Sequence, residues 1–417
     1  MSTNYDVAII GSRLSGGTLS MLLARKGLRV VAVDKATFPS SKVPCTHTIP
    51  AGAMDTLKRI GLFDLFIKAG ADPVRSVDFV YPQGRTRGEI RTNGVPTPGL
   101  QLRRLITDNI VVEQAAKAGG ELREGFMVRD LIREDGCVAG FVGENSAGET
   151  EEIRARITVV ADGRKSSFGN ESGFVKRWPC HRFYYYRYFR AASPVEPIIL
   201  CWDENPGILC VGPSGEGLMQ AMVAPHCREF NDFVRDLENN FTARLRTVPA
   251  IRQILDTAEP IGRVVGRGNL DNTYRDPICP GLILLGDAGL DVDPLAAQGT
   301  AWAFISAEIL ADVLDRCFKE NDFSHGSLNE YRIRRDERLL EYFKFFTLWS
   351  LARTRTAEDE KFVERCLADP QLTSDLSGLW HMTVKPSAVF PEVRFQTPIE
   401  SWENENPSTF DLPATAL

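Results

Sequence analysis

The sequence predicts an α/β protein with one domain on a largely parallel sheet, a second domain with a mixed β-sheet, and helices toward the C-terminus. The first supporting observation is an N-terminal succession of apolar run, glycine-rich turn, helical stretch and apolar run, the pattern of a βαβ unit. The second is the return of short apolar runs at 157–161 and 282–285, as expected for strands buried on both faces. The third is a region of strand-like alternation between these runs, typical of a separate sheet.

The size and charge of the chain limit the classes of function. At 417 residues the chain is too long for one simple core and suits two interleaved domains. A net charge of -6, without a run of lysines and arginines, argues against a nucleic-acid partner. No apolar run reaches the roughly 18 residues that a membrane span needs.

The cysteines and histidines indicate a compartment and argue against a metal. Nine cysteines without a Cys-x-x-Cys pair fit reduced thiols, and the N-terminus has no basic region or cleavage site, so we expect a cytoplasmic protein. The five histidines show no i,i+3 or i,i+4 pairing, so we expect no protein-bound metal. The sequence does not predict the oligomeric state.

The first elements form the βαβ unit. Val7–Ile10 is an apolar run and predicts a strand buried on both faces. Gly17–Arg25 predicts a helix that ends at Gly27, a good residue for a helix C-terminus. Leu28–Val33 predicts the second strand.

The middle of the chain predicts helices and then a β-meander. The helices are expected at about 54–69 and at Leu105–Gly119. Asp135-Gly136 between apolar alternations is a strong hairpin signal. The strands expected around and after it are Met127–Arg133, Cys137–Gly143, Thr150–Arg154 and, back in the parallel sheet, Ile157–Ala161.

The second half begins with the second domain and ends in helices. Strand-like segments at Ile198–Val211 and Leu218–Val223 indicate its sheet, and helical stretches follow between Glu229 and Ala258. Leu282–Leu285 predicts a third buried strand of the parallel sheet. Helices are then expected at Gly299–Leu314 and within 328–369, with a polar, loose tail beyond about 401.

A glycine-rich turn at the first strand–helix junction predicts a dinucleotide site. It reads Gly11-Ser12-Arg13-Leu14-Ser15-Gly16, where Gly11 permits the tight turn and Gly16 permits close packing of helix and strand. The helix N-terminus would present N–H groups to a pyrophosphate. Asp34, followed by Lys35, ends the second strand, where a carboxylate accepts ribose hydroxyls. A tight turn without a ligand is the alternative.

Two distant segments repeat the pattern of a strand followed by an acid. Asp162-Gly163 follows one buried strand, and Gly286-Asp287 follows another. Pro294 and then Gly299-Thr300, which open a helix, come next. Only one Rossmann-like unit is present, so a nicotinamide dehydrogenase and a flavoprotein are both conceivable, and these distant segments favour the flavoprotein.

With these three motifs the chain resembles the flavoprotein monooxygenases of the para-hydroxybenzoate hydroxylase fold, a superfamily shared with geranylgeranyl reductases and flavin-dependent halogenases. The resemblance covers about residues 5–315. Within the superfamily the chain is most similar to bacterial dehydrogenase-type flavoproteins, which have a Gly-x-Arg-x-x-Gly fingerprint and a Thr-His pair, here Thr46-His47. It implies an α/β fold in which a Rossmann-like FAD-binding domain is interleaved with a mixed β-sheet substrate domain, followed by C-terminal helices.

The implied division has seven parts. The FAD-binding domain would comprise 1–75, 104–171 and 266–325, and the substrate domain 76–103 and 172–265. A C-terminal helical region would span 326–400, and a flexible tail 401–417.

The resemblance also implies roles for single residues. Asp287 would bind the ribityl hydroxyls, Pro294 would lie against the isoalloxazine ring, and the N–H groups of Gly299 and Thr300 would face its N1–C2=O edge. The remaining residues expected near FAD are Arg104, Val128 and Asp162, besides Gly11–Gly16, Asp34 and Lys35. One departure is Gly169, where the family has an arginine; it leaves open how a reduced nicotinamide docks.

His47 is the one candidate for a catalytic side chain. It lies on the loop after the second strand and could exchange a proton during the reaction. A histidine that only hydrogen-bonds the cofactor or the backbone is an equal alternative. The aromatic runs Phe183–Tyr188 and Tyr342–Leu351 either line a substrate pocket or serve as packing.

The resemblance implies an FAD-dependent monooxygenase that hydroxylates or epoxidises a hydrophobic aromatic or polycyclic molecule, free or carrier-bound, through a flavin C4a-hydroperoxide. It would use O2, with NAD(P)H or a separate flavin reductase as the electron donor. The alternatives are a reductase or desaturase of a carbon–carbon bond, a halogenase, and a flavin- or ligand-binding protein without turnover. The absence of Trp-x-Trp-x-Ile-Pro and Tyr-x-Trp-x-Phe-Pro motifs favours the monooxygenase.

Overall fold

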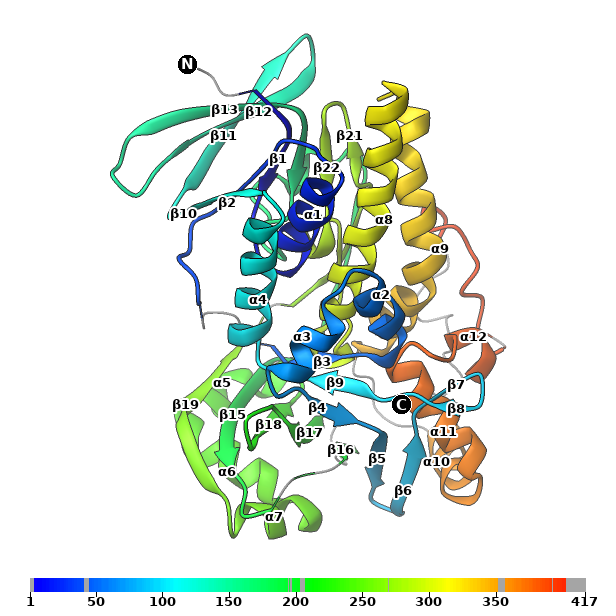
Figure 1. Cartoon of the computed structure of the whole chain (residues 1–417). Helices are drawn as coiled ribbons and strands as arrows, with labels where there is room; N and C mark the ends of the chain where they lie inside the picture. The colour runs from blue at the N-terminus through cyan, green and yellow to red at the C-terminus, as the bar shows by residue number, and fades with distance from the viewer. Residues whose placement is uncertain are drawn as a thin grey trace.

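Two large sheets, one above the other in Figure 1, organise the computed structural model of the chain. The structure describes residues 4–40, 45–193, 195, 197–202, 207–268, 270–351, 357–391 and 393–402.

The upper sheet contains the N-terminal βαβ unit. Its parallel strands lie in the order β10 (Glu121–Glu124), β2 (Val30–Asp34), β1 (Asn4–Ile10), β13 (Thr150–Val160) and β22 (Leu282–Leu284). The first half of β13 also pairs with an antiparallel meander formed by β12 (Cys137–Glu144) and β11 (Met127–Glu134). The predicted α/β class is confirmed.

Both faces of this sheet are buried, which explains its apolar strands. On one face α1 (Leu14–Arg25) packs between α4 (Arg104–Lys117) and α8 (Gly299–Glu320) (Figure 1). On the other face, side chains such as Ala8 and Val31 pack against the meander. Apolar residues at successive positions are therefore needed along β1 and β2.

The structure corrects several predicted elements. The strands expected at Thr150–Arg154 and Ile157–Ala161 are one strand, β13, because the chain stays extended through Ala155 and the exposed Arg156 between them. The helix expected at 54–69 is two helices, α2 (Met54–Arg59) and α3 (Phe63–Lys68), separated at Gly61, whose φ is +77°. The segment 198–211 is two strands, and the predicted tail beyond residue 402 lies outside the described residues.

The lower sheet has a buried face on each side. Its strands pair antiparallel except for one parallel pair, β16 with β5. Helices α5 (Phe230–Arg235), α6 (Leu237–Arg246) and α7 (Pro249–Leu255) pack on the face that points away from the upper sheet. In order across the sheet the strands are β19 (Glu259–Arg267), β15 (Tyr184–Arg190), β18 (Leu218–Ala224), β17 (Ile208–Pro213), β16 (Ile198–Trp202), β5 (Ser76–Tyr81) and β6 (Gly84–Glu89).

The aromatic run Phe183–Tyr188 is divided between these two faces. Phe183 and Tyr185 contact Phe233 of α5. Tyr184 and Tyr186 belong to the core on the side of the upper sheet. The run therefore packs on both sides, and only alternate residues face the first domain.

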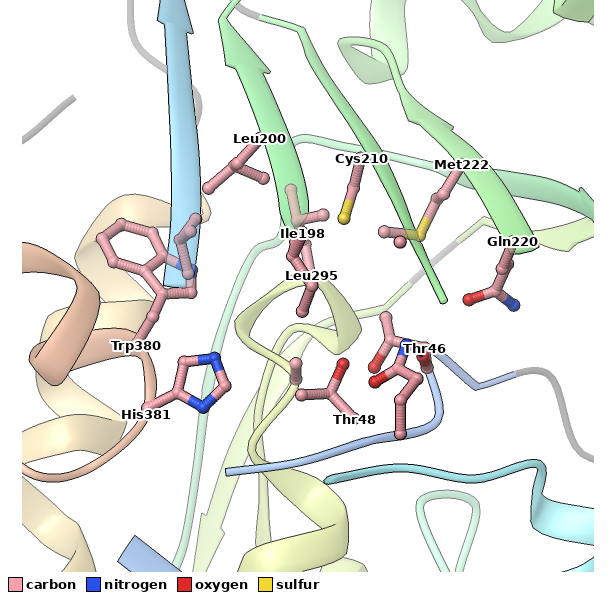
Figure 2. A pocket seen from close by; sticks show the side chains of 14 residues that line it. Thr46, Thr48, Ile198, Leu200, Cys210, Gln220, Met222, Leu295, Trp380 and His381 are labelled. Atoms are coloured by element: carbon pink, nitrogen blue, oxygen red, sulfur yellow. Dashed lines mark hydrogen bonds between the residues drawn. The ribbon is translucent and has the colours of Figure 1, made fainter. Parts of the chain in front are cut away.

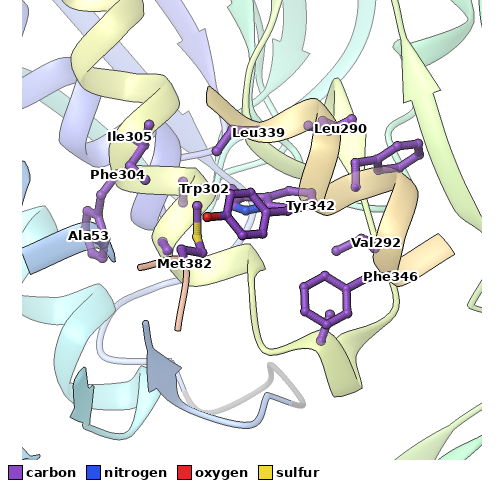
Figure 3. Close-up of a cluster of buried hydrophobic side chains, with 14 of the residues drawn as sticks. Ala53, Leu290, Val292, Trp302, Phe304, Ile305, Leu339, Tyr342, Phe346 and Met382 are labelled. Atoms are coloured by element: carbon purple, nitrogen blue, oxygen red, sulfur yellow. The ribbon is translucent and has the colours of Figure 1, made fainter. Parts of the chain in front are cut away.

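The C-terminal helices attach to both sheets. α9 (His325–Trp349) packs on α8, with the rings of Trp302 and Phe343 6.5 Å apart, and Figure 3 shows the buried apolar cluster to which both helices contribute. Tyr342–Trp349 is buried, so this aromatic segment mainly serves packing. α10 (Ala357–Ala368) and α11 (Pro370–Trp380) lie against β6 of the lower sheet.

Candidate active site

Several predicted site residues meet at the carboxyl edge of the parallel sheet. Gly11–Gly16 follow β1, Asp34 ends β2, Asp162 follows β13, and Asp287 follows β22. In an open α/β sheet, ligands bind in the crevice outside these strand ends. Lys35 is exposed at the same edge, and Val128 lies farther out, on β11.

The glycines of the first turn occupy positions without room for a side chain. Gly11 has a φ of +97°, and a Cβ there would lie 2.4 Å from the carbonyl oxygen of Ala161. A Cβ on Gly16 would lie 1.8 Å from the carbonyl oxygen of Gly11. Among the described residues no side chain caps the start of α1, so its first N–H groups are available to an anion.

The carboxylate of Asp34 is held against this turn. The N–H of Ser12 donates to Asp34 Oδ2 at 3.1 Å, and the N–H of Ala36 donates to Oδ1 at 2.9 Å. Each oxygen keeps a lone pair for another donor. The arrangement fits a ligand with hydroxyl groups beside a phosphate, as in a dinucleotide.

A cluster of two arginines and one aspartate stands beside the start of α1. Arg13 Nη1 and Arg104 Nε each lie 2.9 Å from an oxygen of Asp108, whose side chain is fully buried. Arg13 also donates to Ser40 Oγ at 2.9 Å, so its side chain turns away from the glycine turn. Two positive charges and one negative charge leave the cluster with a net charge of +1, which suits a neighbouring phosphate.

Two more carboxylates lie at the sheet edge with few donors. Asp162 Oδ2 accepts from the N–H of Ser167 at 2.9 Å, whereas no described residue donates to its buried Oδ1. Burial raises the pKa of Asp287, while the charges of Arg164 and Arg104 oppose the rise. Buried polar atoms are normally hydrogen-bonded, so these carboxylates fit a ligand rich in hydroxyl groups.

The start of α8 adjoins Asp287. A Cβ on Gly299 would lie 3.5 Å from Asp287 Oδ1, and Thr300 Oγ1 donates to the carbonyl oxygen of Thr48. Pro294 opens a short 3-10 helix, η5 (Pro294–Ala296), just before α8. The structure therefore brings together the carboxylate, the turn and the helix start that follow β22.

Asp293 anchors this turn, and its role was not predicted from the sequence. Its carboxylate accepts from the N–H of Leu295 at 2.8 Å and from the hydroxyl of Tyr184, with Arg182 at 3.8 Å. Asp293 is fully buried. An aspartate before a proline at a helix start is a local signal that could have identified it.

His47 is buried with both ring nitrogens engaged. The N–H of Arg104 donates to Nδ1 at 3.2 Å, and Nε2 is hydrogen-bonded to the hydroxyl of Tyr188. Burial, with the charges of Arg104 and Arg103, lowers the pKa of His47 to about 3. The neutral ring therefore carries its proton on Nε2 and donates it to Tyr188, whose hydroxyl has Tyr186 as a neighbouring partner.

Gly169 stands where the family has an arginine. The space beside this glycine is occupied by an arginine from a different strand, Arg275. A Cβ on Gly169 would lie 2.7 Å from Nε of Arg275, at the end of β20 (Asn272–Arg275). Arg275 Nη1 donates to the carbonyl oxygen of Ala288 at 2.9 Å. The glycine therefore leaves room for a guanidinium that supports the backbone next to Asp287.

A cavity lies between the lower sheet and the turn of Pro294–Ala296 (Figure 2). About 570 Å³ there is not filled by protein atoms, including the part open to solvent. Its polar lining consists of Thr46, Thr48, Gln101, Gln220 and His381, and none of its described lining residues carries a formal charge at neutral pH. The larger apolar side chains around it are Val77, Ile198, Leu200, Met222, Leu295 and Trp380.

Sequence reasoning missed most of these lining residues. They lie on or next to β3 (Thr48–Ile49), β9 (Gly99–Gln101), four strands of the lower sheet, η5 and the end of α11. The lining residues of one segment carry no pattern that distinguishes them from core residues. No local signal could have assembled the cavity.

Comparisons with known proteins agree with this geometry. The family described as FAD binding domain matches residues 4–338. Conditioned medium factor receptor 1 of Dictyostelium discoideum is 26% identical over 352 residues, which cover 79% of this chain and 66% of that protein. Digeranylgeranylglycerophospholipid reductase of Thermoplasma volcanium is 26% identical over 337 residues, covering 78% of this chain and 82% of the relative.

Solved structures show the same fold at lower identity. The flavin-dependent brominase Bmp2 has a TM-score of 0.78 and 18% identity, with 97% of this chain and 100% of that chain covered. PqsL, a probable FAD-dependent monooxygenase from Pseudomonas aeruginosa, has a TM-score of 0.73 and 19% identity, with coverages of 84% and 96%.

Within the part of the chain that the structure describes, no three His, Cys, Asp or Glu side chains gather as a metal site. None of the helices in the described ranges is long and apolar enough to cross a membrane.

Proposed function

We propose that this chain, an FAD-dependent oxidoreductase that belongs to the FAD-binding-domain family, is a monooxygenase that hydroxylates or epoxidises a hydrophobic small molecule. The observation that carries the proposal is the largely apolar cavity next to the turn at Pro294 and the start of α8. A reacting organic molecule held there would be shielded from water.

The residues at the sheet edge would hold FAD. The first turn of α1, with the +1 cluster of Arg13, Arg104 and Asp108, would bind the pyrophosphate, and Asp34 a ribose. The exposed ammonium of Lys35 would add positive charge at this edge. The backbone of Val128 would meet the adenine.

The flavin end would be held from the other side of the edge. Asp162 and Asp287 would accept hydrogen bonds from its hydroxyl groups, since no described residue donates to the buried Oδ1 of Asp162 and burial raises the pKa of Asp287. Pro294 would lie against the ring, and the N–H groups of Gly299 and Thr300 would stabilise negative charge on it. When bound and reduced, the flavin supplies the electrons with which O2 is activated.

The protein's own contribution is orientation, exclusion of water and placement of protons. Asp293 fixes the turn at Pro294 through its bonds to Leu295 and Tyr184. His47, the proposed catalytic side chain, holds the hydroxyl of Tyr188 as an acceptor, so this tyrosine would relay any proton that His47 exchanges.

Rapid mixing with oxygen tests the proposal. FAD-loaded, photoreduced protein is mixed with O2 while its absorption spectrum is followed. We expect a transient species that differs from both reduced and oxidised flavin, and incorporation of isotopically labelled oxygen into a hydrophobic aromatic compound. Direct reoxidation without a transient, together with unlabelled products, would refute the monooxygenase. Anaerobic addition of NADH and of NADPH tells whether a nicotinamide reduces the flavin directly.

A carbon–carbon reductase is the second candidate. Two observations favour it: relatives named digeranylgeranylglycerophospholipid reductase, and a cavity whose apolar walls also suit an alkene chain. This candidate predicts that an isoprenoid alkene reoxidises the reduced protein without oxygen. Reoxidation only by O2 would exclude it.

A further inference from the structure

The uncharged cavity contains a hydrogen-bond acceptor that no described residue satisfies. Gln101 is 3% exposed and ends strand β9. Its Nε2 donates to the carbonyl oxygen of Thr46 at 2.9 Å. No described residue donates to Gln101 Oε1, which is buried.

The orientation of this amide is fixed by its partner. A carbonyl oxygen can only accept a hydrogen bond, so the NH2 group of Gln101 must face Thr46. Rotating the amide would place two oxygens against each other and would leave the NH2 group without Thr46 as a partner. Oε1 therefore remains the atom that needs a donor, and an unsatisfied buried acceptor is costly.

His381 adds a donor to the same cavity. The N–H of Ala51 donates to His381 Nδ1 at 3.4 Å, and burial lowers the pKa of His381 to about 3, so the neutral ring carries its proton on Nε2. Among the described residues, none is hydrogen-bonded to Nε2. Figure 2 shows the ring pointing into the space bounded by Trp380, Leu295 and Thr48.

The two groups lie on one side of β9. A Cβ on Gly99 would lie 2.7 Å from His381 Nδ1, so the ring packs on Gly99. Gln101 is two residues farther along the strand and points to the same side, about 7 Å away along the backbone. An acceptor and a donor therefore occupy neighbouring positions in the cavity wall.

We infer that the cavity selects a neutral, mostly apolar molecule with a hydroxyl group that donates to Gln101 Oε1, and that it disfavours the corresponding anions. This inference rests on the proposed function, since it names the class of substrate for the same site. A second oxygen on the molecule would accept from His381 Nε2. A carboxylate has no hydroxyl proton to give, and no described lining residue has an opposite charge to offset its desolvation.

Calorimetric titration of the oxidised, FAD-loaded protein tests the inference without turnover. The probes are a naphthol, the corresponding methoxynaphthalene and the corresponding naphthoate. We expect the naphthol to bind about tenfold more tightly than its methyl ether, the size of one hydrogen bond to an otherwise unsatisfied acceptor. The naphthoate should bind more weakly than both.

Gln101→Met removes the acceptor at similar length. This variant should bind the naphthol no better than the ether, whereas Gln253→Met, an exposed glutamine on α7, should keep the tenfold difference. Equal affinity of naphthol and ether in the unchanged protein, preference for the naphthoate, or no binding of the three probes would each overturn the inference. The comparison of probes in the unchanged protein does not depend on the stability of a variant. Because no oxygen chemistry is measured, failure here is distinct from failure of the monooxygenase proposal.

Discussion

Replacing Asp108 by asparagine should destabilise the protein strongly, because this carboxylate is the shared partner of two arginines. The oxygens of Asp108 lie 2.9 Å from Arg13 Nη1 and from Arg104 Nε, and its side chain is fully buried. The arginine side chains are 23% and 15% exposed, so water replaces the lost charge only in part. Removing one partner of such a buried ion pair costs about 3–5 kcal/mol.

Urea denaturation of the FAD-free protein, followed by tryptophan fluorescence, measures this loss. Asp55→Asn, at an exposed aspartate paired loosely with Lys58, should change the free energy of unfolding by less than about 0.5 kcal/mol. FAD should restore part of the stability of Asp108→Asn, since its phosphates would supply the missing negative charge to the arginines. A loss below about 1 kcal/mol for Asp108→Asn would refute the reasoning, since that is the usual value of a solvent-exposed pair.

Three further predictions concern the sheet edge and the buried histidines. Asp287→Ala should purify with little FAD, measured by the ratio of flavin to protein absorbance, whereas the exposed Asp271→Ala keeps it; full FAD retention in Asp287→Ala would contradict the ribityl role. Gly16→Ala should also lose FAD, because its Cβ would meet the carbonyl oxygen of Gly11 at 1.8 Å; an unchanged flavin content would count against a tight turn. His47 and His381 have pKa values of about 3 in the folded protein against an ordinary value of 6.5, so the unfolded chain takes up their protons first. The free energy of unfolding should therefore fall as the pH drops from about 6.5 toward 3, by up to about 1.4 kcal/mol per pH unit for each histidine. Urea titrations at several pH values should show that the free energy of unfolding falls less steeply with decreasing pH for His381→Phe than for the unchanged protein. An equal slope in both proteins would exclude that His381 is buried in its neutral form.

The sequence predicted those parts of the fold that depend on local pattern. A glycine turn follows the buried strand β1, an acid ends β2, and a glycine together with an acid follows β13 and β22; each of these signals marks the carboxyl end of a parallel strand. β10 was missed because Glu121–Glu124 is a short edge strand with partly exposed side chains, so it has no apolar run. β13 was divided in two because the exposed Arg156 interrupts its apolar run and looks like a break in the strand.

The parts that could not be predicted depend on contacts between distant segments. Arg13 and Asp108 are 95 residues apart, and nothing near either residue indicates their ion pair. Gln101 and His381 approach each other only because α11 packs on the lower sheet near β9. His47 was identified as a candidate from its loop, but its protonation and its partner Tyr188 follow from burial, which the sequence does not give.

The origin of the cavity walls has a consequence for how relatives diverge. Trp380 and His381 reach the cavity from the end of α11, outside the strands and turns that carry Gly11, Asp162 and Asp287. Mutations at this C-terminal end can reshape the space while leaving the residues at the sheet edge untouched. Natural selection can therefore change the molecule that the cavity accepts and retain the same residues for binding the cofactor.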